Sequence, residues 1–136
     1  MVVVDSGVWI DFFNGVVNAE SDELERLLAS GEVRIVVPDL VLFEVLRGFR
    51  HERDHRAARE LLGGLAIEAA VSPELAQLAA QHYRHLRSMG VTVRSSIDVL
   101  VAGFCIERDY LLLHNDRDYS AFEDWRGLRC LRPTRH

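Results

Sequence analysis

Cysteine is scarce in this sequence. Cys105 and Cys130 are the two cysteines in 136 residues, and neither belongs to a CxxC motif or a Cys/His spacing. A disulfide framework is therefore excluded, because such frameworks need several paired cysteines. We expect both residues to be reduced core thiols of a cytoplasmic protein.

Long hydrophobic runs are also missing. The sequence has no stretch of eighteen or more apolar residues, so we expect no membrane span and no membrane partner. No basic segment precedes a hydrophobic one near the start, and an acid already stands at position 5. These features argue against a signal peptide.

Lysine is absent, and all 16 basic residues are arginine. Arginine has a planar fork that holds phosphate or carboxylate groups with two hydrogen bonds. The net charge of −5 argues against a protein that coats nucleic acid. It does not exclude an enzyme whose acids gather in one cleft with arginines at the rim.

The remaining composition is that of a globular chain. Hydrophobic residues make up 49% of it, and we find no repeat, linker or low-complexity segment. A chain of this length buries a substantial core. We predict a single domain over residues 1–136.

Apolar, β-branched runs alternate with helical periodicity along the chain. We predict strands over Val2–Asp5, Val33–Val37, Leu65–Ala70, Leu111–His114 and Leu128–Leu131. We predict helices over Ser6–Asn14, Ser21–Ser30, Leu40–Arg47 (with Asp39 as N-cap), His51–Leu62, Pro73–Met89, Ser96–Arg108 and Tyr119–Trp125. This alternation indicates an α/β fold with a mainly parallel sheet flanked by helices. Ligands of such sheets bind at the carboxyl ends of the strands.

Two acids stand at a strand end or a helix start on the expected edge of the sheet, and both have a simpler alternative as helix caps. Asp5 follows the first strand and could cap the next helix. Asp98 lies three residues after Ser95, which fits a capping box. Capping and cation binding are compatible, because both place a carboxylate at a helix N-terminus.

Three further acids have alternatives of their own. Glu44 lies in the apolar stretch LVLFEVL, where a carboxylate is costly to bury unless it is paired, and Arg47 is one turn away. Asp116 and Asp118 follow the strand in LLLHNDRDY and could simply form a polar turn.

Together these acids suggest a cation site. Two like charges ~4 Å apart repel by about 4 kcal/mol at an effective dielectric constant near 20. Convergent carboxylates must therefore stay partly protonated or bind a divalent cation. Oxygen ligands favour Mg²⁺ or Mn²⁺ over zinc.

The stretches VVVDSGVWIDFF, PDLVLFEVLRG and SSIDVLVAGFCIERDYLLLHNDRDY resemble those of PIN-domain proteins, and more closely the VapC-type toxins of VapBC toxin–antitoxin systems. The resemblance covers nearly the whole chain and implies a PIN-like three-layer sandwich. It implies a catalytic and metal-binding quartet of Asp5, Glu44, Asp98 and Asp116, with Asp118 as an additional metal-binding acid.

The resemblance also implies an activity and partners. Such proteins are Mg²⁺- or Mn²⁺-dependent endoribonucleases, so we expect an RNA substrate, with structured RNA such as tRNA favoured. We expect a homodimer that is inhibited by a cognate VapB antitoxin. The chain departs from the family pattern at Gly7 and Tyr119, and we expect neither position to touch the acids.

Substrate contacts are expected from Ser6 and Arg47. The arginines at positions 47, 50, 53, 56 and 59 recur every third residue, which drifts around a helix, and most of them fit a solvated face. Two alternatives remain. One is a phosphatase of the haloacid dehalogenase type, although Gly7 stands where its second aspartate belongs. The other is a non-catalytic RNA- or protein-binding module.

Overall fold

A four-stranded parallel sheet forms the centre of the computed structural model, which describes residues 1–133. The strands lie in the order β3-β2-β1-β4. Their bounds are β1 Val2–Val4, β2 Ile35–Pro38, β3 Ala66–Glu68 and β4 Leu111–Leu113. The sheet confirms the predicted α/β class, and it is parallel throughout the described part of the chain.

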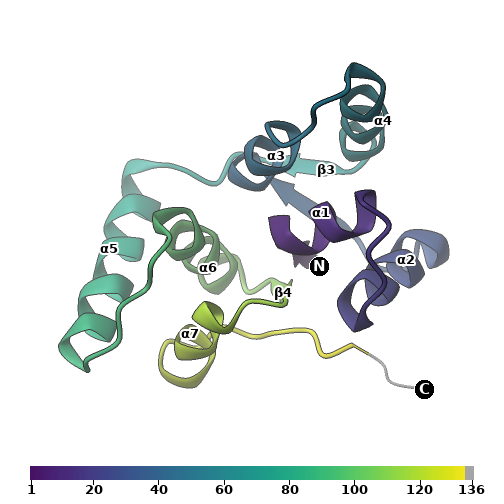
Figure 1. Ribbon diagram of the computed structural model, residues 1–136. Helices are drawn as coiled ribbons and strands as arrows, with labels where there is room; N and C mark the ends of the chain where they lie inside the picture. The colour runs from purple at the N-terminus through teal and green to yellow at the C-terminus, as the bar shows by residue number, and fades with distance from the viewer. Residues whose placement is uncertain (134–136) are drawn as a thin grey trace.

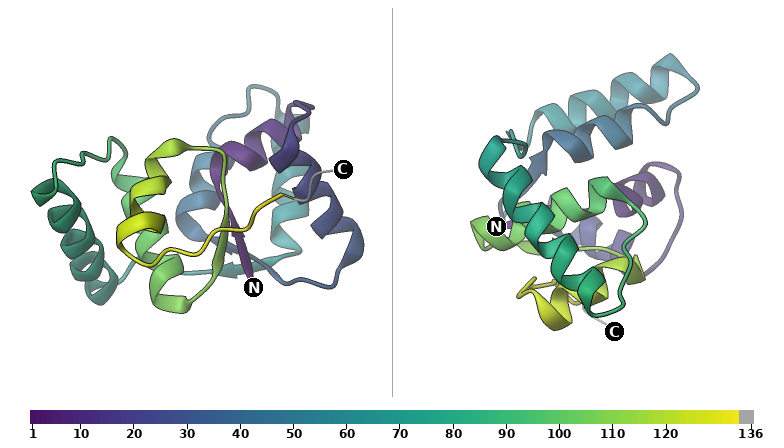
Figure 2. Two further views of the ribbon diagram at one scale, coloured as in Figure 1. Left: turned by 90° about the horizontal axis from the view of Figure 1, so that it is seen from below. Right: turned by 90° about the vertical axis from the view of Figure 1, so that its left-hand side faces the viewer.

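Helices flank this sheet (Figure 1). They are α1 Ser6–Phe13, α2 Ala19–Ser30, α3 Asp39–Leu46, α4 Glu52–Gly63, α5 Pro73–Ser88, α6 Ser96–Arg108 and α7 Ser120–Trp125, with a 3₁₀ turn η1 at Arg117–Tyr119. Figure 1 shows α5, α6 and α7 together on one side and α1 and α2 on the other. The views in Figure 2 show α3 and α4 lying beside each other away from α5.

The two central strands, β1 and β2, are apolar and are covered by helices on both faces of the sheet. All residues of β1 and β2 are buried, which explains why they read as unbroken runs rather than alternating patterns. Trp9 of α1 and Phe104 of α6 are among the largest fully buried side chains. None of the described helices is long and apolar enough to cross a membrane.

The structure corrects the predicted starts of α2 and α3. Helix α2 begins at Ala19 rather than Ser21, because Asn18 accepts a hydrogen bond from the N–H of Ser21 at 2.8 Å and forms a capping box. Asp39 is the first residue of α3 and not its cap. Its carboxylate instead accepts the N–H of Ala70 at 3.1 Å, which joins α3 to the segment after β3.

The expected strand over Leu128–Leu131 is reduced to a single parallel bridge between Leu112 and Cys130. The other predicted strands are present with shifted ends. At the functionally important edge, β1 and β4 end side by side, and the N–H of Asp5 donates to the carbonyl of Leu113 at 2.9 Å. Asp5, which follows β1, therefore lies beside the end of β4.

Candidate active site

Asp5 has a buried carboxylate at the end of the central strand. The residue is 4% exposed and occupies the N-cap position of α1, yet its side chain makes no cap hydrogen bond. Its Oδ1 instead accepts a hydrogen bond from the hydroxyl of Tyr119 at 2.8 Å. The capping alternative therefore does not account for this carboxylate.

Asp98 reaches the same hydroxyl from the first turn of α6. Ser95 caps this helix by accepting the N–H of Asp98 at 3.3 Å, as predicted. This cap uses the backbone N–H of Asp98 and not its carboxylate. The carboxylate Oδ1 lies 3.2 Å from the hydroxyl of Tyr119. Asp5 and Asp98, 93 positions apart in the sequence, are thus joined through one side chain.

The expectation that Tyr119 does not touch the acids was wrong. Its side chain is fully buried, and its hydroxyl lies between the two carboxylates. A phenol has a single proton, so it donates to one carboxylate at a time. The tyrosine at this position was the available signal in the sequence, because a tyrosine hydroxyl that is buried needs a hydrogen-bond partner.

Asp116 and Asp118 complete the cluster from the turn after β4. Asp116 accepts the N–H of Asp118 at 2.9 Å and caps η1, so the polar-turn alternative is also correct. One carboxylate oxygen each from Asp98, Asp116 and Asp118 lies within 4.8 Å of the others. The turn therefore places acids against α6.

Glu44 lies on α3, with the hydroxyl of Ser6 donating to its Oε1 at 3.0 Å. The expected pairing with Arg47 is present but loose, at 3.8 Å between Nη2 and Oε2. The Arg47 side chain is 58% exposed and lies over the ring of Phe43. Glu44 is thus held by Ser6, while Arg47 stands at the rim.

The acids perturb one another, and we refer to Asp5, Glu44, Asp98, Asp116 and Asp118 as the acidic cluster. Burial raises the pKa of Asp5 to about 6, opposed by the Tyr119 hydrogen bond and reinforced by Glu44. Burial, and then the charge of Asp5, raise the pKa of Asp98 to about 7. Without a cation, these two carboxyl groups therefore keep their protons to a higher pH than ordinary aspartates.

The donor set fits a hard divalent cation. It consists of carboxylate oxygens, with no thiolate or imidazole among them, which suits Mg²⁺ or Mn²⁺. Asp98, Asp116 and Asp118 are close enough to share one ion. A dication would also offset the repulsion that raises the pKa values of Asp5 and Asp98.

An open cleft of about 770 Å³ adjoins the cluster. It is lined by Asp116 and Asp118 together with Arg94, Asn115 and Arg117. Our reading of the sequence missed Arg94 and Arg117, because neither belongs to a periodic pattern. The five arginines from position 47 to 59 are exposed, as expected for a solvated face.

Gly7 also faces this site, contrary to expectation. A Cβ atom at this position would lie 3.2 Å from Oδ1 of Asn115 and 3.8 Å from Oδ2 of Asp5. A side chain at position 7 would therefore press against the Asn115 amide and touch the carboxylate of Asp5. The absence of a side chain leaves the first turn of α1 open beside the cluster.

The structure has a parallel sheet with acids at its carboxyl edge. Comparison with known protein families agrees with this architecture. The chain belongs to the PIN domain family, whose model matches residues 2–124. It is homologous to VapC ribonucleases. It is 29% identical over 122 residues to ribonuclease VapC11 of Mycobacterium tuberculosis and to VapC ribonuclease Mb1587 of Mycobacterium bovis, covering 88% of this chain and 89% of each relative.

Solved structures share the fold. VapBC2 from Rickettsia felis, bound to a promoter DNA fragment, matches with a TM-score of 0.75 at 18% identity, covering 96% of this chain and 98% of that one. The sarcin–ricin loop cleaving toxin VapC20 of Mycobacterium tuberculosis matches with a TM-score of 0.68 at 23% identity, covering 98% and 100%. At these identities the likeness is one of fold.

Proposed function

We propose that this protein is a divalent-metal-dependent endoribonuclease that acts as the toxin of a VapBC-type pair in the cytoplasm. The main support is the meeting of acids from separate segments, after β1, on α3, on α6 and after β4, at one edge of the sheet. The homology to VapC ribonucleases adds to this. Mg²⁺ or Mn²⁺ is the proposed cofactor.

Each side chain has a proposed role in phosphodiester hydrolysis. When bound, a divalent cation would lower the pKa of a water molecule and polarise a phosphate oxygen. Asp5, Asp98 and Asp116 would hold this cation, with Asp118 as a further ligand. Tyr119 keeps Asp5 and Asp98 together.

The remaining groups would act on the water and the RNA. Glu44, which accepts the hydroxyl of Ser6, would orient the attacking water. Arg94 and Arg117 line the cleft and would hold phosphates of the RNA, with Arg47 at the rim. Their planar forks suit phosphate recognition. We favour a structured RNA such as tRNA as the substrate.

An antitoxin is the proposed protein partner. The fold neighbours include the VapBC complexes of Rickettsia felis and Salmonella typhimurium and a toxin–antitoxin complex from Klebsiella pneumoniae. An acidic cluster beside an open cleft is chemically suited to accept an arginine from such a partner. We propose that the chain also forms a homodimer.

The test is cleavage of total RNA by the purified, antitoxin-free protein with Mg²⁺ or Mn²⁺, compared with EDTA. We expect discrete products in the presence of metal and none from Asp98→Asn, because this change removes a ligand while keeping the shape of the side chain. Full activity of a folded Asp98→Asn protein would refute the proposed role. Mapping the product ends would identify the target.

Two alternatives are less well supported. A haloacid dehalogenase phosphatase would need a second aspartate at position 7, where this chain has glycine, and the matching family model is the PIN domain. A non-catalytic binding module would not require an assembled acidic cluster. It would bind RNA equally well in EDTA and leave it uncut.

A further inference from the structure

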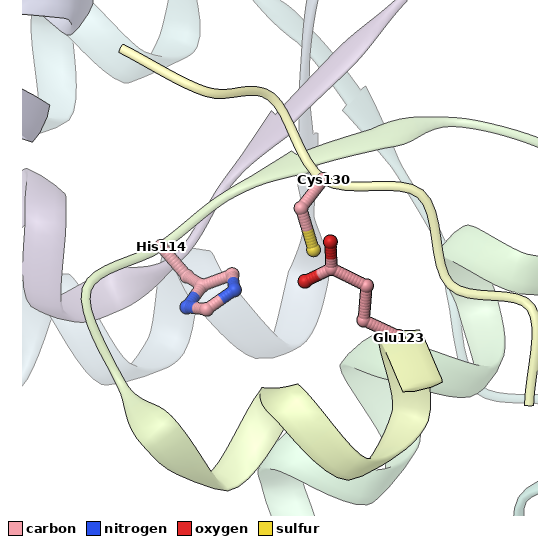
Figure 3. A group of neighbouring side chains, drawn as sticks. All are labelled: His114, Glu123 and Cys130. Atoms are coloured by element: carbon pink, nitrogen blue, oxygen red, sulfur yellow. The ribbon is translucent and has the colours of Figure 1, made fainter. Parts of the chain in front are cut away.

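A second group of metal-ligating side chains lies beside the acidic cluster. His114 follows β4, Glu123 is on α7, and Cys130 pairs with β4 through the Leu112 bridge. One ligand atom from each of the three residues lies within 4.8 Å of the others. Figure 3 shows the imidazole, the carboxylate and the thiol converging on one point from these three segments. We call this group the HEC cluster.

An unpartnered ring nitrogen points to a ligand here. Nε2 of His114 is buried and makes no hydrogen bond, although buried polar atoms are normally satisfied. The other nitrogen, Nδ1, accepts the N–H of Asp116 at 3.2 Å. In Figure 3 one nitrogen of the ring faces Glu123 and Cys130. The nitrogen without a partner is therefore the one available to the cluster.

We propose that the HEC cluster is a binding site for a borderline divalent cation, of which Zn²⁺ is the natural representative. Imidazole nitrogen, thiolate sulfur and carboxylate oxygen are the three ligand types that zinc accepts in proteins. Three protein ligands leave a fourth position for water. The set is unlike the all-oxygen acidic cluster, so the two sites would select different ions.

The charges balance when the cation binds. The Cys130 thiol loses its proton to solvent, and the resulting thiolate and the Glu123 carboxylate neutralise the dication. Neutral His114 contributes the lone pair of Nε2 and carries its proton on Nδ1. Because a protonated Nδ1 does not accept, the hydrogen bond from the N–H of Asp116 is lost when the cation binds. Arg132 is paired with Glu123, but its side chain is 68% exposed and moves into water at low cost.

The HEC cluster is in contact with the acidic cluster through His114. The imidazole packs against the ring of Tyr119, with centroids 4.9 Å apart, and Tyr119 bridges Asp5 and Asp98. Its Nδ1 holds the backbone of Asp116. Zinc at Nε2 would therefore act on two residues that shape the acidic cluster.

Cobalt is the probe for this site, because Co²⁺ replaces zinc and shows a charge-transfer band only when a thiolate binds it. Metal-free protein is titrated with Co²⁺ under reducing conditions. We expect a thiolate band that saturates at one equivalent, is removed by Zn²⁺ and persists with Mg²⁺. The readout does not require nuclease activity, so its failure is distinguishable from failure of the proposed function.

Matched variants assign the band to its ligands. Cys130→Ser should abolish it, whereas Cys105→Ala and Asp98→Asn should retain it, because Cys105 is buried in the core outside the HEC cluster. Glu123→Gln keeps the thiol and should weaken Co²⁺ binding about tenfold or more. Circular dichroism verifies that each variant is folded.

Three outcomes would overturn the proposal. One is cobalt binding without a thiolate band in the folded wild-type protein, which would place the ion at the acidic cluster only. Another is a band that survives in Cys130→Ser or disappears in Cys105→Ala. The third is unchanged Co²⁺ affinity in Glu123→Gln.

Discussion

At the scale of single residues, the hydroxyl of Tyr119 connects two members of the acidic cluster. It is buried with Asp5 and Asp98 and is within hydrogen-bond distance of both. Groups that orient metal ligands commonly determine metal affinity as strongly as the ligands themselves. Because Tyr119 contacts both Asp5 and Asp98, we propose that it positions these two carboxylates.

We predict that Tyr119→Phe weakens Mn²⁺ binding about 10- to 100-fold, because Asp5 and Asp98 lose the group that orients them. Isothermal titration calorimetry measures the change. Tyr83→Phe, on α5, is the matched control and should leave the affinity unchanged. Equal Mn²⁺ affinities of Tyr119→Phe and wild type would show that the cluster is held by other contacts.

The raised pKa values of Asp5 and Asp98 predict how stability depends on pH. In the folded state these acids keep their protons up to about pH 6 and about pH 7, whereas the ordinary pKa is 3.8. Between these limits the unfolded state binds fewer protons. The free energy of unfolding should therefore fall as pH rises, by about 1.4 kcal/mol for each unit of pKa difference as an upper bound.

Thermal unfolding of metal-free protein tests this expectation. The melting temperature should be lower at about pH 8 than at about pH 5, and Mn²⁺ should restore it at the higher pH. Asp98→Asn should reduce the difference between the two pH values, since an amide does not titrate. An equal pH dependence of wild type and variant would assign the effect to other groups.

At the scale of elements, the sequence predicted what depends on local patterns. Unbroken runs such as Val2–Val4 gave the buried strands, and Ser72 gave the start of α5 through its side-chain cap. The parallel sheet in turn predicted that Asp5 and Asp116 lie at one edge. These inferences rest on contacts within a few residues or on general rules of topology.

Contacts between distant segments were not predictable in the same way. The N–H of Ala70 donates to Asp39, 31 positions away, and this contact replaced an expected cap. The position of Tyr119 between Asp5 and Asp98 depends on how η1 packs against α6. No periodicity encodes such a placement, because it results from the packing of whole elements.

Packing of α5 against α6 determines where Asp98 lies. Gly103 is at this contact, and a Cβ there would lie 3.4 Å from Cβ of Ala79 and 3.7 Å from Cδ1 of Leu75. We predict that Gly103→Val destabilises the protein by about 1–3 kcal/mol, because the added methyl groups overpack the contact. Urea unfolding measures the change.

The control for this variant is Gly63→Ala, in α4. A Cβ at position 63 meets nothing within 4 Å, so alanine should stabilise the protein by about 0.5–1 kcal/mol through its higher helix propensity. If Gly103→Val were as stable as wild type, α5 and α6 would have to separate without cost. The position of Asp98 would then not depend on this contact.

At the scale of the whole molecule, a net charge of −5 must be reconciled with the RNA binding that we propose. Arg94 and Arg117 line the cleft next to Asp116 and Asp118, so positive charge is available where phosphates would lie. The rest of the acidic surface would repel RNA elsewhere. Binding should therefore be confined to this cleft.

We predict that Arg94→Ala with Arg117→Ala raises the Kd for RNA about tenfold or more and reduces its salt dependence, because fewer counterions are released. Fluorescence anisotropy with the Asp98→Asn background measures binding without cleavage. Arg129→Ala is the control, since Arg129 is exposed and paired with Asp109 at the other end of β4. A control variant that lost as much affinity would place the RNA elsewhere.

The central position of β1 has a consequence for synthesis of the protein. This strand leaves the ribosome well before β4, Leu111–Leu113, which is one of its two neighbours in the sheet. Asp5 must therefore wait for the segment that includes Tyr119 before its carboxylate has a partner. A growing or prematurely ended chain that lacks Tyr119 would have no assembled acidic cluster, so the proposed activity would arise only after this segment has been made.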